Sequence, residues 1–354
     1  MADFSNNIDD KKLILPTVND STDFKQNNEK TLQSLAFRAM ILFQIIAYGS
    51  SSVLIHLCEK NGVITFSSTA MNLILEVVKL SFSIIALTIS SSTIGNIYLS
   101  KEQLISWVRQ SLPYSIPGVL YFINNNLAVH MQLYMDPTSY QVLANFKILT
   151  TAILYRLIIK QNLKRKQWFA LFLLFSGGVA YSLGTIRNSS SVSKQATTSS
   201  AVMNGMYVHP LGFFMIAIYC TISGFSGVYN EWILKKYYTE SIHIQNIFLY
   251  TYGVIFNLIS AITVATYLPG SSYSFNLLHG FTIYTWIIIL TQALSGIFMS
   301  IVIKHSSNII RLFVISFSLI VTAVLSVFIF NIHLNIYFFI TFATMMCALS
   351  IYYS

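Results

Sequence analysis

Charged residues are scarce in this sequence. Only 9% of the 354 residues are Asp, Glu, Lys or Arg, whereas a soluble domain typically carries about 25%. Apolar residues make up 55% of the chain, and the mean hydropathy is +0.63. Because so few charges cannot cover a soluble fold with a hydrated surface, the composition predicts an integral membrane protein that has the lipid bilayer as a partner.

Cysteines and enzyme motifs are also lacking. The three cysteines, Cys58, Cys220 and Cys347, have no CxxC spacing, so they indicate neither a disulfide framework nor a metal site. The seven histidines are scattered, and there is no HExxH, GxSxG or Walker-type loop. We therefore expect no enzyme, no cofactor and no coupled ATPase, and any transport should run on gradients or exchange.

Basic residues outnumber acidic ones, 21 to 12, but they form no single patch. They lie between apolar runs, where the topology of a membrane protein needs them. Nucleic acid is therefore not an expected partner. Residues 1–34 are polar and of mixed charge, which is typical of a disordered segment. They are interpreted as a cytosolic tail without a cleaved signal peptide.

Long apolar runs fill the rest of the chain. A membrane-spanning helix needs about 20 mainly apolar residues. The fold class predicted on this rule is an all-α integral membrane protein of about ten transmembrane helices. The spans lie near residues 35–57, 68–90, 111–131, 137–159, 165–184, 207–230, 246–267, 280–303, 309–330 and 334–353.

Loop charges predict the orientation, because short cytoplasmic loops are enriched in Lys and Arg. The loops after the second, fourth and sixth spans are basic, with Lys101 and Arg109, then four basic residues within 160–166, then Lys235 and Lys236. The loops after the seventh and ninth spans contain no Lys or Arg. Both termini are therefore predicted to face the cytosol.

A Ser/Thr-rich stretch at residues 185–206 has the composition of a flexible linker and should be lumenal in this topology. It divides the chain into a first five-helix half, residues 35–184, and a second five-helix half, residues 207–354. Two inverted five-helix repeats would give this arrangement, and many transporters are built in this way.

Lys147 is the clearest ionisable residue in the middle of a predicted span. A charge there costs roughly 2.5–3.5 kcal/mol on insertion scales, so it calls for a function or a partner. Tyr140 lies two turns earlier on the same helix face. Lys147 is expected either to bind phosphate together with this phenol or to form a buried ion pair with Glu76.

Glu76 and Lys79 share one face of the second span at a spacing of three residues, which favours a local ion pair with a structural or a gating role. Lys304 lies near the end of the eighth span. A lysine there either extends to the membrane interface or binds a ligand.

Amides and small residues mark three further spans. Because three consecutive asparagines point around a whole helix, at least one of Asn124, Asn125 and Asn126 must face a cavity or a neighbouring helix. Asn246 and Tyr250 lie one turn apart in the seventh span. The stretch 223–227 in the sixth span is rich in Ser and Gly, which by itself favours close helix packing.

From about residue 38 to its end, the sequence resembles the nucleotide-sugar transporters of solute carrier family 35, subfamily A. Within that subfamily, residues 134–137 and 304–314 are most similar to the branch of probable UDP-sugar transporters. Five segments carry the resemblance: Glu76–Leu80, Tyr121–Asn126, Met135–Ile148, Ser223–Glu231 and Lys304–Asn308.

This resemblance implies the drug/metabolite-transporter fold with two inverted repeats and a location in the Golgi membrane. It also implies exchange of a cytosolic nucleotide-sugar for a lumenal nucleoside monophosphate. Lys147 and Lys304 would contact the phosphates. The residues that would line the nucleotide cavity are Tyr121, Asn124, Asn125, Tyr140, Ser223, Asn246 and Tyr250.

Some positions depart from the pattern of relatives that carry CMP-sialate or UDP-galactose. Those relatives often have Gln at the position of Asn124, and Tyr-Gln at the positions of Ala144 and Asn145. Shorter side chains next to Lys147 should reshape the pocket. The expected ligand is a pyrimidine nucleotide-sugar, either a UDP-sugar or a CMP- or CDP-linked sugar or polyol.

Two other functions stay open at this point. The altered pair Ala144-Asn145 is compatible with a non-transporting membrane scaffold or regulator of other Golgi sugar transporters. A small-molecule exporter on the same fold would not need two lysines that contact phosphate. Small-residue helix faces serve bundles and dimers alike, so homo-oligomers and hetero-oligomers with other membrane proteins both stay open.

Overall fold

The computed structural model describes residues 35–60, 63–64, 66–90, 101–131, 143–193, 210–267, 278–330 and 336–354. The predicted tail at 1–34, Tyr140 and residues 194–209 lie outside these ranges.

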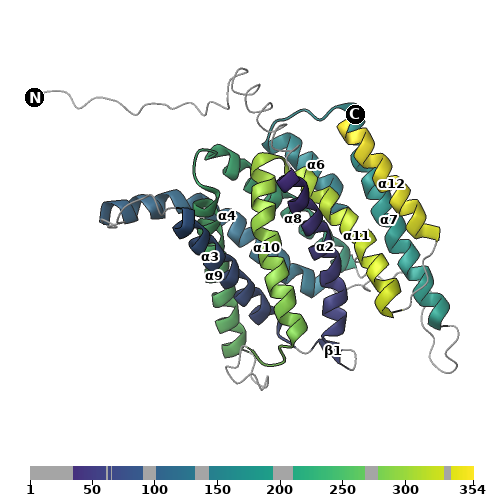
Figure 1. Cartoon of the computed structure of the whole chain (residues 1–354), viewed down its shortest axis with the longest axis horizontal. Coiled ribbons are helices and arrows are strands. Elements are labelled where there is room, and N and C mark those ends of the chain that lie inside the picture. Colours follow the sequence, from purple (N-terminus) through teal and green to yellow (C-terminus); the bar gives the residue numbers. More distant parts are fainter. Residues whose placement is uncertain are drawn as a thin grey trace, which may run out of the picture.

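Ten helices make up most of the described chain (Figure 1). They correspond in order to the ten predicted spans, so the all-α prediction is confirmed. A two-residue antiparallel pair, β1 (Glu59–Lys60) with β2 (Val63–Ile64), follows the first helix. The helices are α2 (Leu35–Leu57), α3 (Ser68–Ser90), α4 (Lys101–Met131), α6 (Lys147–Ile158), α7 (Arg165–Ser193), α8 (Pro210–Lys236), α9 (Ile242–Tyr267), α10 (Ile283–His305), α11 (Asn308–Phe330) and α12 (Ile336–Tyr353).

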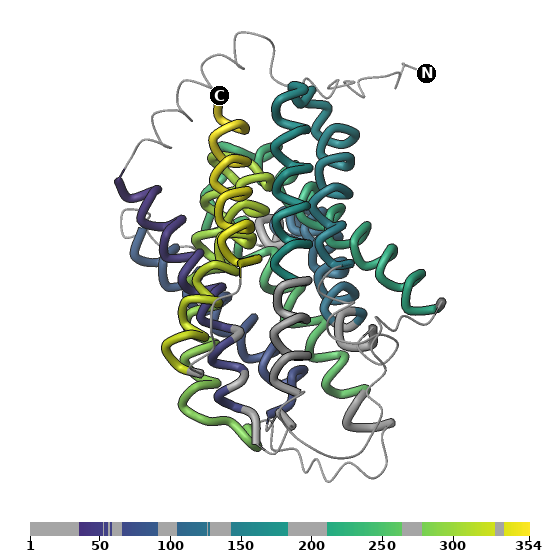
Figure 2. Tube along the Cα trace, turned by 90° about the vertical axis from the view of Figure 1, so that its right-hand side faces the viewer, coloured from purple at the N-terminus to yellow at the C-terminus, as the bar shows by residue number. Residues whose placement is uncertain are grey.

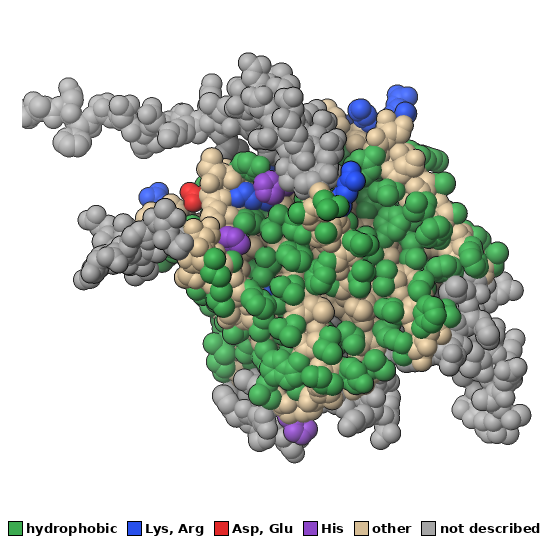
Figure 3. Space-filling view, in the orientation of Figure 1, with side chains coloured by type: hydrophobic (Ala, Val, Ile, Leu, Met, Phe, Trp, Pro, Cys, Tyr) green, Lys and Arg blue, Asp and Glu red, His purple; other side chains and the backbone are tan. Residues whose placement is uncertain are grey.

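The helices present an apolar outer surface. Seven of them, α2, α3 and α8 to α12, are long and apolar enough to cross a membrane. Large apolar side chains such as Leu42 and Ile46 of α2 and Leu258 and Ile259 of α9 are exposed. Hydrophobic side chains cover most of the face shown in Figure 3. Because exposed apolar surface of this extent is unfavourable in water but suits hydrocarbon, the chain is a multi-pass membrane protein.

The helix contacts repeat between the two halves. α2 contacts α10 and α11, and α8 makes the corresponding contacts with α4 and α6. α3 contacts α9, and α7 contacts α12. Glycines allow two of these helix pairs, α2 with α11 and α8 with α6, to pack closely. A Cβ at Gly49 of α2 would lie 2.7 Å from the Ser318 carbonyl oxygen of α11, and one at Gly224 of α8 would lie 3.2 Å from the Thr151 backbone of α6. Two five-helix repeats would give this pattern.

Two helix boundaries, the start of α4 and the end of α7, lie well outside the predicted spans. α4 begins at Lys101 rather than near residue 111, so Lys101 and Arg109 lie in a helix and not in a loop. A hydropathy rule misses this start because it stops at charged residues, although residues 101–110 contain no helix breaker. The first turns of α4 project from the side of the bundle (Figure 1), and Pro113 and Pro117 lie within the helix. α7 continues to Ser193, so part of the predicted 185–206 loop is helical.

The predicted fourth span is not one continuous helix. Leu143 and Ala144 are helical, Asn145 and Phe146 form a turn, and α6 begins at Lys147. Asn145 Nδ2 donates a hydrogen bond to Ser182 Oγ of α7 at 3.4 Å. Across this turn the backbone hydrogen bonds span three residues instead of four, from the Phe146 N–H to the Leu143 carbonyl oxygen and from the Ile148 N–H to that of Asn145, both at 3.0 Å. Lys147 is therefore the first residue of a short helix rather than the middle of a long one.

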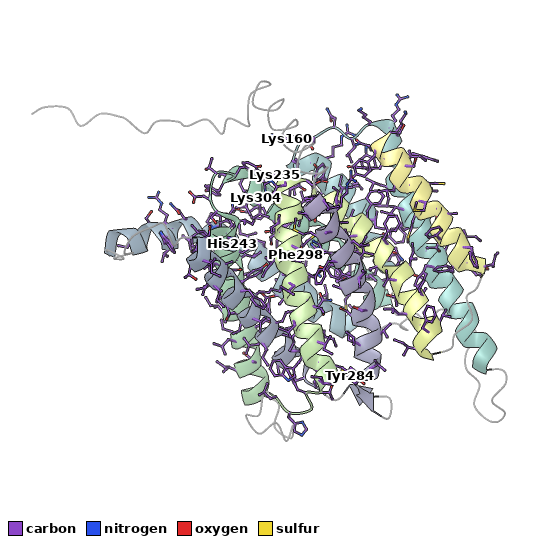
Figure 4. All side chains as sticks on the ribbon, in the orientation of Figure 1. Lys160, Lys235, His243, Tyr284, Phe298 and Lys304 are labelled. Carbon is purple, nitrogen blue, oxygen red and sulfur yellow. The ribbon has the colours of Figure 1, made fainter. Side chains whose placement is uncertain are left out.

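The start of α2 and the end of α12 lie at the same end of the bundle (Figures 1 and 2). Lys160, Lys235 and Lys304 lie toward that end, whereas Tyr284 lies at the opposite one (Figure 4). The described helices are even in number, and the lysines lie at the end of the bundle where α2 begins and α12 ends. The loop charges predict this arrangement.

Candidate substrate-binding site

Glu76 and Lys79, both in α3, form an ion pair that lies where the first half of the chain packs against the second. Lys79 Nζ lies 2.6 Å from Glu76 Oε1, and both side chains are largely buried. The ammonium lies 5.3 Å from the ring centroid of Tyr250 in α9. Glu76 contacts α9 beside Gly253, and the Lys79 stem contacts α10 beside Gly296. The pair thus joins α3, α9 and α10, and Glu76 is not available for the alternative ion pair with Lys147.

Tyr250 points into this interface from α9, and Asn246 lies one turn earlier on the same helix face. The Tyr250 hydroxyl lies 3.5 Å from Ser300 Oγ of α10. Asn246 is fully buried, and neither its Oδ1 nor its Nδ2 has a hydrogen-bond partner among the described residues. Gln44 of α2 is also fully buried, and neither its Oε1 nor its Nε2 has a hydrogen-bond partner among the described residues. A buried amide without partners costs free energy, so these side chains are suited to meet a polar ligand or water.

Lys147 lies where α6 meets α8. Thr150 Oγ1, one turn along α6, donates to the Cys220 carbonyl oxygen of α8 at 3.1 Å. Lys147 is half-buried, and within the described ranges no carboxylate lies at ion-pair distance from it. Its charge adds to the positive end of the α6 dipole, so this position attracts an anion.

The ammonium group of Lys304 contacts other groups of the protein. Its side chain is 4% exposed, and Nζ donates to the Glu240 carbonyl oxygen at 2.5 Å. The ammonium also lies 5.5 Å from the ring centroid of Tyr238. Lys304 is therefore buried against the protein at this end of the bundle rather than extended into solvent. It is directed toward the connection between α8 and α9.

The remaining predicted residues are distributed over α4 and α8. Asn124 Oδ1 is buried without a partner in the described part of the chain, whereas Asn125 is exposed. Ser223 of α8 is half-buried, and its carbonyl oxygen accepts a hydrogen bond from Ser226 Oγ at 3.0 Å. The side chain of Asn126 lies outside what the structure describes. The structure thus brings Glu76, Lys79 and Tyr250 together, with Asn246 one turn earlier on α9. Lys304 lies one turn beyond Ser300, the α10 neighbour of Tyr250, and bonds to the connection between α8 and α9.

A buried carboxylate network was missed by the sequence analysis. Glu231 of α8 is fully buried. It accepts hydrogen bonds from Lys235 Nζ at 2.6 Å and from the Asn308 backbone N–H at 2.7 Å. Lys235 Nζ also donates to the Ser306 carbonyl oxygen at 2.5 Å. These bonds fix the turn between α10 and α11 to α8. The four-residue spacing of Glu231 and Lys235 was the available signal.

Arg311 was also missed as a site residue. It lies in the first turn of α11, and its Nη1 donates to the Tyr121 hydroxyl of α4 at 3.4 Å. The signal was a single arginine at the start of an otherwise apolar run.

These positions, in a bundle of membrane-length helices, are those of a polytopic membrane carrier. The bundle contains basic side chains and unsatisfied amides, which suit an anionic, hydrogen-bonding solute. The described residues hold no cluster of three or more side chains that could bind a metal ion.

The chain belongs to the nucleotide-sugar transporter family, whose profile matches residues 31–353. Three similar proteins are each named "Probable UDP-sugar transporter protein SLC35A4". The Xenopus tropicalis protein is 38% identical over 328 residues, which cover 92% of this chain and 94% of that protein. The Danio rerio protein is 36% identical over 334 residues, covering 94% and 99%. The Homo sapiens protein is 35% identical over 315 residues, covering 89% and 93%.

A solved crystal structure has a similar fold. Its TM-score is 0.60 at 9% sequence identity, over 89% of this chain and 96% of that chain. At this identity the match concerns the fold alone.

Proposed function

We propose that this protein is a Golgi antiporter that exchanges a cytosolic pyrimidine nucleotide-sugar for a lumenal nucleoside monophosphate. The ligand class is a UDP-sugar or a CMP- or CDP-linked sugar or polyol. Family membership supplies the nucleotide-sugar, and the names of the similar proteins favour a UDP-sugar.

The observation that carries the proposal is Lys147 at the start of a broken helix. A discontinuous helix whose positive end meets an anionic substrate group is a recurring element of transporter sites. Lys147 adds a point charge there without a carboxylate at ion-pair distance among the described residues. Tyr121, Asn124, Asn125, Tyr140, Ser223, Asn246 and Tyr250 are proposed to line the cavity, and Lys304 to meet phosphate in part of the cycle.

The two halves, residues 35–184 and 207–354, are proposed to rock against each other around this site. The repeated helix contacts support such a division. The pair Glu76–Lys79 joins α3 of one half to α9 and α10 of the other, so a gating role for it fits the same scheme.

The first test is thermal unfolding of the purified protein with UMP, CMP, GMP, AMP and their sugar conjugates. A ligand that binds only the folded state stabilises it by about 2.7 kcal/mol at a hundred times its Kd. Pyrimidine nucleotides should raise the Tm of the wild type, and Lys147→Ala should lose this shift together with exchange in reconstituted vesicles.

Lys160→Ala is the matched control, because Lys160 is an exposed lysine in the connection after α6. This variant should keep both the shift and exchange. Normal exchange by a folded Lys147→Ala variant would contradict the proposed site. No saturable uptake of any nucleotide-sugar by the wild type would favour the scaffold function instead.

A further inference from the structure

Arg311 has an unusual environment for a charged residue in a membrane helix. Its Cζ lies 5.8 Å from the ring centroid of Tyr121, whose hydroxyl accepts the hydrogen bond from Nη1. Tyr48 of α2 and Tyr219 of α8 also lie close enough to interact electrostatically with the guanidinium. Tyr121 of α4 therefore contacts the guanidinium directly, and the phenols of Tyr48 and Tyr219 lie within electrostatic range of it.

None of these neighbours neutralises the charge. Within the described part of the chain, no carboxylate lies at ion-pair distance from Arg311, and its buried Nε has no hydrogen-bond partner. A guanidinium has several N–H donors in a planar fork, and among the described residues only the bond to Tyr121 uses one. Arg311, Tyr48 and Tyr121 each keep part of their surface exposed. Free donors and accessible surface thus occur together between α2, α4 and α11.

Lys147 and Arg311 both lie near the same part of α8. Arg311 interacts with Tyr219, and Lys147 interacts electrostatically with Cys220, the next residue. Lys304 instead faces Tyr238 and Glu240, beyond the end of α8 at Lys236. At about 1.5 Å per residue, the 17 residues from Tyr219 to Lys236 span about 25 Å. Of the two basic residues Arg311 and Lys304, Arg311 therefore lies nearer to the level of Lys147 along α8.

We propose that Arg311 contacts an anionic group of the transported ligand between Tyr48, Tyr121 and Tyr219, and that it favours diphosphates over monophosphates. Lysine acts as a point charge, whereas the arginine fork binds neighbouring phosphate oxygens through parallel hydrogen bonds. Lys147 can thus hold one phosphate and Arg311 the next. This inference rests on the proposed function.

A purely structural role makes a different prediction. If Arg311 only held α11 against α4 through the ring of Tyr121, its replacement would lower the Tm and leave the order of ligand affinities unchanged. The ratio of diphosphate to monophosphate affinity separates the two roles, because a general loss of stability does not change it.

The experiment measures Kd values of the purified full-length protein for UMP, UDP, CMP and CDP. The wild type should bind each diphosphate more tightly than its monophosphate. Arg311→Gln should lower that ratio by about tenfold, as expected for the loss of a charge-assisted hydrogen bond, while monophosphate affinity stays within about threefold. Arg311→Lys keeps the charge without the fork and should give an intermediate ratio.

Arg156→Gln is the matched control, because Arg156 is an exposed arginine of α6, and it should leave the ratio unchanged. An unchanged ratio in Arg311→Gln, or an equal loss for both ligand classes, would overturn the inference while the proposed function stands. If Arg311→Gln does not fold, an unchanged ratio in Arg311→Lys has the same meaning. A wild type that binds none of the four nucleotides would overturn the proposed function and this inference with it.

Discussion

Glu231 illustrates how one side chain can organise the end of a helix bundle. Its carboxylate receives hydrogen bonds from Lys235 and from the first backbone N–H of α11. Glu231→Ala should lower the free energy of unfolding by about 3 kcal/mol, because removing one partner of a buried pair leaves the other charge uncompensated. We place the value at the low end because the Lys235 side chain is 20% exposed. Thermal unfolding in detergent should show a Tm lower by several degrees.

Two further variants test whether the buried ion pair causes this loss of stability. Glu231→Ala combined with Lys235→Met removes both charges, so it should lose less stability than Glu231→Ala alone. Glu240→Gln changes an exposed carboxylate in the next connection and should leave the Tm near that of the wild type. If Glu231→Ala and Glu240→Gln behaved alike, the network would not stabilise the fold.

The sequence predicts contacts between residues that are close along a helix better than contacts between helices. The three-residue spacing of Glu76 and Lys79 was sufficient to predict their ion pair. Nothing local shows that Glu231 binds the backbone of Asn308, because that neighbour arrives through tertiary packing. The same holds for Arg311, whose surrounding tyrosines come from α2, α4 and α8.

At the scale of the helices, α2 packs closely against α11 at Gly49. A Cβ at Gly49 would lie 2.6 Å from Val321 Cβ and 2.7 Å from the Ser318 carbonyl oxygen. Because the oxygen belongs to a helix backbone, it cannot rotate away. Gly49→Ala should therefore separate α2 from α11 and destabilise the protein by about 1–3 kcal/mol, as overpacking typically does. The Tm and the yield of folded protein measure this effect.

Gly296→Ala is the comparison for this prediction. Its Cβ would lie 3.1 Å from Lys79 Cε, which is part of a flexible side chain. This variant should therefore be milder. A Gly49→Ala variant at least as stable as Gly296→Ala would show that α2 and α11 can move apart at little cost.

Hydropathy predicted the number and order of the helices because each span requires a long apolar run. It failed where apolarity and helix formation differ. The first turns of α4 are helical but charged, and the predicted fourth span is apolar but broken at Asn145 and Phe146. The side-chain bond from Asn145 to α7 that accompanies this break connects residues 37 positions apart, so the local sequence does not reveal it.

At the scale of the whole molecule, the orientation is testable. The start of α2 and the end of α12 share the end of the bundle toward which Lys160, Lys235 and Lys304 lie (Figure 4). We expect that end to face the cytosol, because basic residues are retained on that side. A C-terminal epitope tag should bind antibody in cells whose plasma membrane alone is permeabilised, and it should colocalise with Golgi markers.

A tag inserted within residues 268–277, between α9 and α10, is the control. It should become accessible only after all membranes are opened. The reverse pattern of accessibility would contradict the orientation, and staining outside the Golgi would contradict the proposed location.

The bond from Lys304 to the Glu240 carbonyl oxygen bears on how tightly this carrier holds its cargo. The Lys304 ammonium has three N–H donors, and an anion that meets it in the proposed site must share its charge with this carbonyl oxygen, so it binds less tightly than to a lysine without a partner. Weak retention of this kind shortens the residence time of cargo. A carrier gains from it, since each cycle must end with release on the far side.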